Sequence, residues 1–411
     1  MTEPTLRIPT LVMGLTNLPF GAYGAVTLIT VPQLLAARHV SEPQIAAITA
    51  TAMIPTVCSF LLAPMLDVGF SRRRYALALG ILTAVASFLA LRQHEDLPQL
   101  GLVLILGFFA ASLFSSALAG WLSSVVPQGE AGKLAAGFTI GNIGGFGIGA
   151  ILFITLLRAL PGTLGAVLVS ACVASPLLLL VFIPRSSSNL RGVHESFSTL
   201  GHDLAALLKQ RTVVRTLILF CLPASSFALT NTLGGLGADF DASEGFVALI
   251  AGIGVTAAGI AGSLLIPKVI ERLAPRLTYL AIGSLGALFT LLIIGLPKDP
   301  VVFAVTLIGQ NLFQSAAFVV ETTIIFQSMG SANPLAATQF AFLNAATSLP
   351  IVYMQAVDGR AYGAGGLPTM LATDAVLSLA ACTVLLTLVL WWRRSERAEA
   401  ASRGDFLKAE H

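Results

Sequence analysis

Residues 61–80 read LLAPMLDVGFSRRRYALALG and form the most informative junction in the chain. An apolar run ends at Asp67, and a short turn separates this acidic residue from three consecutive arginines that begin at Arg72. We predict that the Asp67 carboxylate pairs with Arg72 or Arg73, because opposite charges at this separation attract each other. The pair would clamp the two flanking helices together and act as a conformational latch in a two-state cycle. The alternative, that the arginines only anchor the loop at a membrane surface, leaves Asp67 unexplained.

The chain around this junction is too apolar to fold in water. Its 411 residues are 56% hydrophobic and only 10% charged, whereas a soluble domain is about 25% charged. Apolar runs of about 20 residues, the length that crosses a hydrocarbon layer about 30 Å thick, recur along the sequence. We predict an all-α membrane protein with twelve transmembrane helices near 10–37, 43–67, 75–91, 99–126, 135–158, 163–183, 214–236, 244–267, 277–297, 300–327, 336–357 and 367–392.

The distribution of basic residues predicts the orientation of these helices. Cytoplasmic loops retain Lys and Arg, and with the N-terminus inside, 18 of the 23 basic residues fall in inside loops or tails. The chain is therefore expected to be a multi-pass protein of the bacterial inner membrane with both termini in the cytoplasm. We predict a six-helix bundle over 1–183, a cytoplasmic linker over 184–213, a second bundle over 214–392 and a cytoplasmic tail over 393–411. The N-terminus lacks the pattern of a signal peptide, so no cleavage is expected.

The two bundles share a weak internal repeat. LLAP at 61–64 recurs as LLIP at 264–267, an offset of 203 residues, and the Leu-Pro pair at 18–19 recurs at 222–223, an offset of 204. Matches whose offsets differ by only one residue indicate a tandem duplication, as in many transporters. We therefore expect two pseudo-symmetric bundles with the same topology.

A stripe of small residues marks the fifth predicted helix. Gly137, Gly141, Gly145 and Gly149 follow one another at strict four-residue spacing. Small residues at this spacing let two membrane helices approach closely. We interpret the stripe as a helix-packing surface.

The segment 61–80 resembles the signature between helices 2 and 3 of the major facilitator superfamily. The run from Phe60 to Asp67, Phe-Leu-x-x-Pro-x-x-Asp followed by three arginines, is most similar to AmpG-type muropeptide permeases and the related acetyl-CoA transporters, a branch that includes siderophore importers. The helix 1 segment NLPFGAYGAVTLITVPQLL is similar to that branch as well. The resemblance implies the twelve-helix major facilitator fold, with helices 1, 4, 7 and 10 around a central cavity.

Polar side chains recur at helical spacing inside several spans. Gln310, Gln314 and Glu321 fall at i, i+4 and i+11 and so share one face of their helix. Polar groups inside a span normally face water or a protein partner, because exposing them to lipid is costly. We predict a substrate cavity lined by Thr16, Asn17, Tyr23, Thr27, Ser112, Ser116, Asn142, Ser226, Thr230, Asn231, Gln310, Gln314, Asn344 and Tyr353.

Glu321 is the candidate for proton coupling. A carboxylate inside a span is costly when it is ionised, so it favours the neutral form and can exchange a proton during transport. The alternative is a structural carboxylic acid that hydrogen-bonds a neighbouring helix or is hydrated near the cytoplasmic end of its span. Asp374 is a second, weaker candidate for this role within a span, and the alternative for it is a position near the outer end of its helix from which it reaches the interface.

Several other functions lack their motifs. The sequence contains no GxxxxGKS/T phosphate loop, no HExxH zinc motif and no GxSxG nucleophile motif, and all five histidines fall in predicted loops or tails. We therefore expect no enzyme activity, no cofactor and no metal ion. The formal net charge of +3 is too small to indicate a nucleic-acid partner. We expect a monomer whose partners are a small-molecule substrate, protons and the lipid bilayer.

These features together predict a secondary active transporter. Its solute would be small, organic and polar or amphiphilic, muropeptide-like or siderophore-like, and moved by proton-coupled alternating access. The mostly neutral hydroxyl and amide groups of the predicted cavity suit such a solute better than an inorganic ion. Two alternatives stay open: a drug or metabolite efflux antiporter, and a membrane receptor that binds its solute without transporting it.

Overall fold

The computed structural model describes residues 8–93, 96–184, 201–202, 205–331 and 333–409. Within these ranges every regular element is a helix, and ten helices are long and apolar enough to cross a membrane. The longest of them, α17 (Ala336–Ala409), bends at Gly365 and Gly366 into two limbs, which adds an eleventh span. A twelfth is divided into the short helices α11 (Arg211–Cys221) and α12 (Thr230–Leu233). The prediction of an all-helical membrane protein with twelve spans is confirmed.

We call residues 8–184 the first half of the molecule. Its first span comprises α1 (Thr10–Leu15), α2 (Leu18–Ala25), a π-helical turn (Val26–Thr30) and α3 (Val31–Ala36). Its second span comprises α4 (Glu42–Ala52), α5 (Ile54–Cys58) and two 3-10 segments (Ser59–Leu61 and Ala63–Asp67). The others are α6 (Arg72–Arg92), α7 (Leu97–Val125), α8 (Ala131–Ala159) and α9 (Gly162–Ala174), which a 3-10 segment (Ser175–Phe182) extends.

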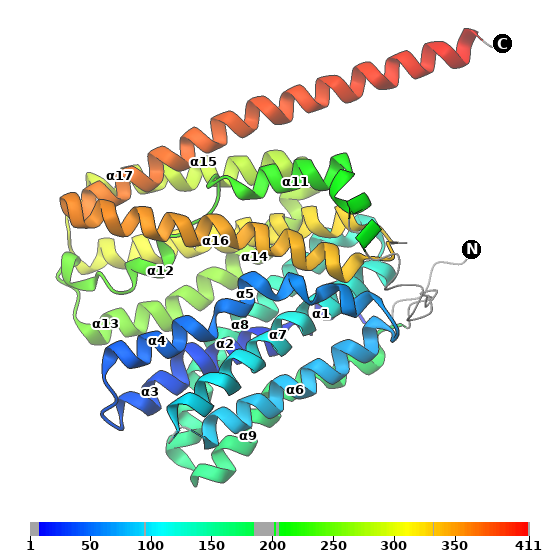
Figure 1. Ribbon diagram of the computed structural model, residues 1–411. Helices are drawn as coiled ribbons and strands as arrows, with labels where there is room; N and C mark the ends of the chain where they lie inside the picture. Colours follow the sequence, from blue (N-terminus) through cyan, green and yellow to red (C-terminus); the bar gives the residue numbers. More distant parts are fainter. Residues whose placement is uncertain (1–7, 94–95, 185–200, 203–204, 332, 410–411) are drawn as a thin grey trace.

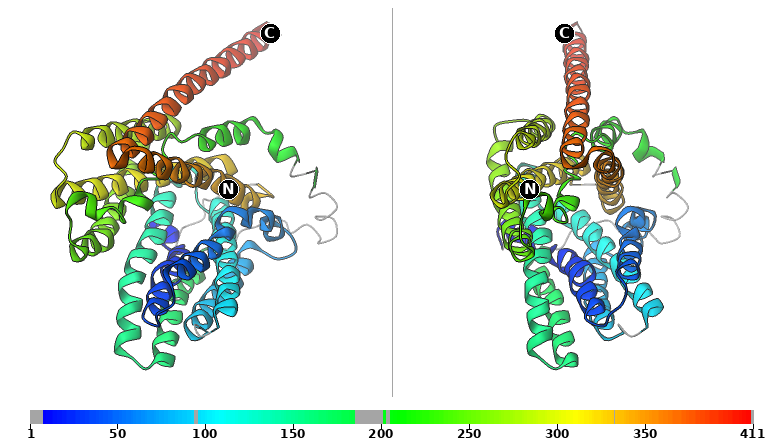
Figure 2. Two further views of the ribbon diagram at one scale, coloured as in Figure 1. Left: turned by 60° about the vertical axis from the view of Figure 1, so that its left-hand side comes forward. Right: turned by 90° about the vertical axis from the view of Figure 1, so that its left-hand side faces the viewer.

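Residues 205–409 form the second half, and Figure 2 shows the two halves as separate bundles. After α11 and α12 come a 3-10 turn (Gly237–Phe240), α13 (Glu244–Leu249), a π-helical turn (Ile250–Gly254) and α14 (Val255–Ile270). The remaining elements are α15 (Pro275–Ile294), α16 (Pro300–Met329) and the two limbs of α17.

The glycine stripe of α8 packs directly on the backbone of the first span. A Cβ atom on Gly137 would lie 2.0 Å from the Leu11 carbonyl oxygen, and one on Gly145 would lie 2.5 Å from the Leu18 carbonyl oxygen. Only residues without a side chain permit this approach. The interpretation of the stripe as a packing surface is confirmed.

The two halves share a hydrophobic core at one end of the molecule only. One buried cluster combines residues of both halves, among them Phe138 of α8, Phe326 of α16 and Phe340 of α17. A second cluster takes its buried residues from 22–173 alone, and a third from 229–371 alone. We call the end with the shared core, which also carries the turn after Asp67, the closed end. At the opposite end each half has its own core.

The last limb of α17 continues beyond the bundle as a single straight helix that ends at Ala409 (Figures 1 and 2). Near the point where it leaves the bundle, Glu396 forms an ion pair with Arg215, whose guanidinium also lies 5.4 Å from the centre of the Trp392 ring. The predicted tail over 393–411 is thus largely helical. The predicted linker over 184–213 lies largely outside the described residues.

Candidate gate and solute-binding site

The predicted charged pair is present at the closed end. Asp67 is the last residue of its 3-10 segment and Arg72 is the first residue of α6. The Arg72 Nε atom lies 2.7 Å from the Asp67 Oδ1 atom, and the Asp67 side chain has no exposed surface. Arg73 points elsewhere, with its guanidinium 5.5 Å from the centre of the Trp121 ring. Arg72 is therefore the partner of Asp67 within the first half.

The Asp67 carboxylate also binds the start of α17 in the second half. It accepts hydrogen bonds from the backbone N–H groups of Ala337 (3.2 Å) and Thr338 (2.9 Å) and from the Thr338 hydroxyl (2.7 Å). The first N–H groups of a helix have no partner within the helix and carry partial positive charge. The buried carboxylate thus caps a helix that belongs to the other half.

Arg72 makes the reciprocal contact with the second half. Its Nη2 atom donates to the carbonyl oxygens of Asn333 (3.0 Å) and Pro334 (2.7 Å), in the turn that precedes α17. A planar guanidinium holds several acceptors at once, which an ammonium group does less well. Asp67 and Arg72 therefore join the two halves, in addition to the two helices that the sequence predicted them to clamp. We call these two residues, with Asn333, Pro334, Ala337 and Thr338, the latch.

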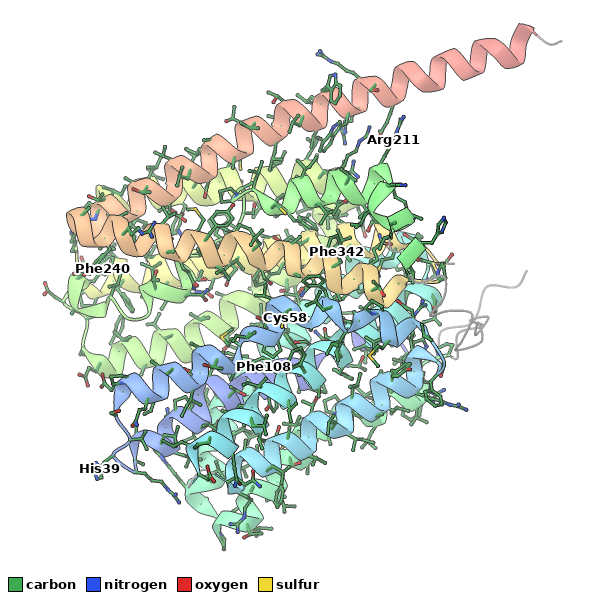
Figure 3. The ribbon with its side chains drawn as sticks, viewed as in Figure 1. His39, Cys58, Phe108, Arg211, Phe240 and Phe342 are labelled. Carbon is green, nitrogen blue, oxygen red and sulfur yellow. The ribbon has the colours of Figure 1, made fainter. Side chains whose placement is uncertain are left out.

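Aromatic side chains seal the closed end beside the latch. The ring centres of Phe138 and Phe340 are 5.6 Å apart, and those of Phe138 and Phe326 are 5.8 Å apart. Phe342, on the α17 face directed toward α5 (Figure 3), packs edge-on against Phe60 with ring centres 5.7 Å apart. Aromatic rings of the two halves are thus in contact with each other at this end.

The first and seventh spans are both interrupted at the repeated Leu-Pro pair. The first span is locally irregular at Thr16 and Asn17, immediately before the pair at 18–19, although both residues keep right-handed helical backbone angles. The seventh unwinds between α11 and α12, over 222–229, and Phe227 there adopts a left-handed φ of 46°. Proline lacks an N–H group and disfavours helical geometry in the residue before it, which explains an irregularity at each position. Helices interrupted at equivalent positions of two repeats are a feature of transporter binding sites.

Three predicted cavity residues near these breaks have polar atoms without a partner. Asn17 Oδ1, Ser112 Oγ and Ser226 Oγ are buried and accept or donate no hydrogen bond within the described part of the chain. Leaving such a group unsatisfied costs about 1–3 kcal/mol. These three atoms are therefore the strongest candidates to bind a solute or its water.

Other predicted cavity residues are satisfied inside one half. The Tyr23 hydroxyl donates to the carbonyl oxygens of Val103 (3.2 Å) and Leu104 (3.1 Å), within the first half. In the second half, the Gln310 amide donates to the Thr290 hydroxyl at 2.6 Å. The Thr16 and Ser116 hydroxyls donate to carbonyl oxygens of their own span. Thr27 is the exception, because it is fully buried and its hydroxyl has no hydrogen-bond partner within the described residues.

The remaining members of the predicted set lie closer to the broken seventh span or are more accessible. The Gln314 amide donates to the Thr230 hydroxyl at 2.7 Å, and the Tyr353 hydroxyl donates to the Cys221 carbonyl oxygen at 2.9 Å. Asn142 is half-buried, and its backbone contacts the first span at Gly21. Asn231 and Asn344 are exposed.

Glu321 is buried inside the second half. It lies on α16, is 5% exposed, and faces the Tyr279 hydroxyl of α15. Ser225 of the broken span donates to the Tyr279 carbonyl oxygen at 3.0 Å, so Tyr279 links Glu321 to that span. The described residues contain no group of three or more His, Cys, Asp or Glu side chains able to hold a metal ion.

Two further carboxyl groups are buried in the second half. Asp374 is only 5% exposed, so the expectation that it reaches the interface is wrong; the bend at Gly365 and Gly366 starts the last limb early enough to place it inside. Asp358 is fully buried and was missed, because the predicted span ended at 357, before a stretch rich in glycine with a nearby arginine. A carboxyl group directly after a long apolar run was the available signal.

Comparison with known proteins identifies the fold. No family model matches the chain, and no curated protein matches it in sequence. Among solved structures, the proton:xylose symporter XylE is 16% identical with a TM-score of 0.67, and covers 92% of this chain and 95% of its own. The E. coli fucose:proton symporter FucP is 14% identical with a TM-score of 0.68, over 93% and 99% of the two chains. The human organic anion transporter MFSD10 is 15% identical with a TM-score of 0.70, over 93% and 100%.

The chain therefore has the major facilitator fold over more than nine-tenths of its length. Identities this low show the fold and do not distinguish the branches within it. The resemblance to AmpG-type permeases stays a prediction.

Proposed function

We propose that this protein is a secondary active transporter that moves a small polar or amphiphilic organic solute by alternating access. The observation that carries the proposal is the asymmetry between the two ends of the molecule. At the closed end the halves share a core and the latch, and at the opposite end each half has a separate core. An arrangement in which two bundles share a core and a charged latch at one end, and have separate cores at the other, is one of the two states that alternating access requires.

The latch supplies the energetic difference between these states. Its hydrogen bonds to Asp67 and from Arg72 exist only while the halves meet at the closed end. Hydrogen bonds to charged groups contribute about 1.5–3 kcal/mol each, so losing several of them is a substantial cost. Binding of a solute or a proton must offset that cost for the halves to separate there.

The charge distribution in the loops favours the cytoplasm as the side of the closed end. The turn after Asp67 carries three consecutive arginines, and the rule that basic loops stay inside puts this turn in the cytoplasm. The described state would then be open or partly open to the outside. We propose the bacterial inner membrane as the location.

The solute is proposed to bind between the broken first and seventh spans. Asn17, Ser112 and Ser226 would supply uncharged polar contacts, and Gln314 and Thr230 lie on the adjacent helices. This chemistry suits a solute with many hydroxyl or amide groups, such as a muropeptide-like or siderophore-like molecule. Two of the structurally similar proteins are proton symporters, which supports proton coupling here.

Glu321 is the proposed coupling residue. It lies beside Tyr279, which Ser225 connects to the unwound part of the seventh span. Gain or loss of a proton at Glu321 would thus act on a segment adjacent to the proposed solute site. A change in the protonation of Glu321 could thus affect solute binding through neighbouring residues alone.

Transport by purified protein in liposomes tests the proposal. Vesicles would be loaded with a pH-sensitive dye and offered muropeptides, siderophores and amphiphilic drugs in turn, in both directions of the proton gradient. A transported solute should drive proton movement in the wild type and in the exposed control Glu244→Gln, and not in Glu321→Gln. Solute efflux against the gradient would identify an antiporter instead. Saturable binding of a solute without its accumulation would contradict transport and identify a receptor.

A further inference from the structure

Two polar side chains lie next to the backbone groups that the latch uses in the second half. Asn333 belongs to the latch through its backbone carbonyl oxygen, which accepts from Arg72, and its side chain has partners of its own. Gln339 follows the latch residue Thr338 directly and has no exposed surface. An amide removed from water costs stability unless its oxygen and its NH₂ group are hydrogen-bonded, so the partners of Gln339 indicate its role.

These side chains form a chain of hydrogen bonds from the start of α17 back to α16. The Leu335 backbone N–H donates to the Asn333 Oδ1 atom (2.9 Å), and the Asn333 Nδ2 atom donates to the Gln339 Oε1 atom (2.5 Å). The Gln339 Nε2 atom donates to the Ser328 Oγ atom (3.0 Å), and the Ser328 hydroxyl donates to the Ile325 carbonyl oxygen (2.8 Å). We call the side chains of Asn333, Gln339 and Ser328 the brace, because they tie the turn before α17 to the last turn of α16.

Gln339 is the central member of the brace, and the two ends of its amide group have different partners. The Leu335 N–H requires an oxygen atom, so Asn333 directs its NH₂ group at Gln339. Gln339 must therefore direct its oxygen at Asn333, which leaves its NH₂ group for Ser328. A side chain that supplies only an acceptor, only a donor or neither would break the chain of hydrogen bonds at this point.

The brace encloses the groups that receive the first half. The hydrogen bond between Asn333 and Gln339 closes the segment 333–339 into a loop. This segment contains every second-half group of the latch, namely the carbonyl oxygens of residues 333 and 334, the N–H groups of residues 337 and 338, and the hydroxyl of residue 338. Asp67 and Arg72 bind these groups while joined to each other, with 2.7 Å between Oδ1 and Nε, so the two sets of groups must be held at a matching separation.

The brace differs from the latch in that it lies entirely within the second half. Its hydrogen bonds join residues between 325 and 339 only, so none of them has to break when the halves separate at the closed end. The brace therefore fixes the segment 333–339 before Asp67 and Arg72 arrive. A segment that is already ordered loses less conformational freedom on binding than a loose one.

We propose that Gln339 is a positioning residue of the latch, which keeps the segment 333–339 in the shape that receives Asp67 and Arg72. It donates to Ser328 and accepts from Asn333, and it acts on the first half through the backbone of this segment. The inference rests on the proposed function, because it assigns Gln339 a role in re-forming the closed end in each transport cycle. Loss of the brace weakens the closed state while Asp67 and Arg72 themselves stay unchanged.

Distances across the closed end of the purified full-length protein test this role. Gln339→Met removes both hydrogen bonds of the amide and keeps an unbranched side chain that adapts to a buried site. Spin labels at the exposed positions Phe70 and Leu273 report on the two halves from outside the segment 333–339; Leu273 follows α14, whose last residue packs against the shared core. We expect the separated population to rise about tenfold in Gln339→Met. Gln327→Met is the matched control, because Gln327 is exposed on α16, and it should keep the wild-type distances.

A double variant distinguishes positioning from a general effect on folding. If Gln339 acts through the latch, adding Gln339→Met to Asp67→Asn should raise the separated population by less than about twofold, because changes within one interaction do not add. An effect independent of the latch would add in full, about tenfold again, and would overturn the proposal. A lower thermal midpoint with wild-type distances in Gln339→Met would show a purely structural role and would overturn it as well.

Failure of this inference and failure of the latch give different results. Wild-type distances in Asp67→Asn would contradict the latch and the role of Gln339 together. Separation in Asp67→Asn without separation in Gln339→Met would overturn the role of Gln339 and leave the latch intact. If Gln339→Met does not fold, Ser328→Ala takes its place, because it removes only the last acceptor of the brace and alanine favours the helix. It should raise the separated population about threefold, and wild-type distances in Ser328→Ala would overturn the proposal.

Discussion

The Thr338 hydroxyl donates a hydrogen bond of 2.7 Å to the Asp67 carboxylate, across 271 positions of the chain and between the two halves of the molecule. The same carboxylate accepts the Thr338 backbone N–H and the Arg72 guanidinium. One buried side chain thus completes a local ion pair and caps a distant helix. The latch can be weakened by a single change without disturbing the core of either half.

Asp67→Asn should shift the equilibrium toward separation at the closed end. The amide keeps the size of the side chain but removes its charge, which we expect to cost the closed arrangement about 2 kcal/mol, or roughly thirtyfold in population. Spin labels at the exposed positions Phe70 and Ser331 would report the distance across the latch. Asp299→Asn is the matched control, because Asp299 caps α16 within one half. Identical distance distributions in wild type and Asp67→Asn would contradict a latch.

Arg72 and Arg73 should differ sharply although they are neighbours. Arg72→Lys keeps the positive charge but cannot hold Asp67 and the carbonyl oxygens of Asn333 and Pro334 together, so we expect transport to fall about tenfold. Arg73→Lys retains a cation beside Trp121 and should change the rate less than about twofold. Initial rates of solute uptake into liposomes measure both. Equal losses in the two variants would show that only net loop charge matters.

Substitution of two adjacent serines in the unwound part of the seventh span should have different effects, one on the stability of the protein and the other on solute affinity. The Ser225 hydroxyl donates to Tyr279, whereas the Ser226 hydroxyl has no partner within the described residues. Ser225→Ala should therefore lose about 1 kcal/mol of stability, while Ser226→Ala should keep or gain stability. If Ser226 binds the solute, Ser226→Ala should weaken binding about tenfold. Thermal midpoints and titration calorimetry give the two readouts, and wild-type affinity in Ser226→Ala would remove this residue from the site.

The effect on stability of replacing a glycine of α8 by alanine should depend on which glycine is replaced. Gly145→Ala places a methyl group 2.5 Å from the Leu18 carbonyl oxygen, whereas Gly144→Ala meets no atom within 4 Å. Forcing the first span away from α8 should cost about 1–3 kcal/mol in Gly145→Ala. Gly144→Ala should leave stability unchanged or raise it, since alanine favours the helix. Thermal unfolding in detergent distinguishes the two variants, and equal midpoints would refute the close contact.

Length and hydropathy predict the spans well because a bilayer imposes a fixed length on each helix. The eighth predicted span, over 244–267, matches the observed segment formed by α13 and α14. The ion pair between Asp67 and Arg72 can be predicted from the sequence equally well, since the two residues are only five positions apart. Local spacing thus predicts local contacts.

The sequence could not predict the contacts that join the halves. The N–H groups of Ala337 and Thr338 are backbone atoms, which every non-proline residue possesses, so no residue type marks them as partners of Asp67. Helical spacing placed Gln310 on a common face with Gln314 and Glu321, but spacing does not fix how that face is rotated toward its neighbours. Gln310 accordingly binds Thr290 inside the second half.

Because the last limb of α17 is straight, the position of its tip reports rotation of the second half of the molecule. From Trp392 to Ala409 the helix extends about 26 Å, and it has no bend after Gly366. A rigid-body rotation of about 15°, the size seen in known subunit transitions, would move its tip roughly 7 Å relative to its root. This helix would therefore convert a small rotation into a larger displacement of its end. A fluorophore attached there would let single-molecule optics follow the displacement in real time.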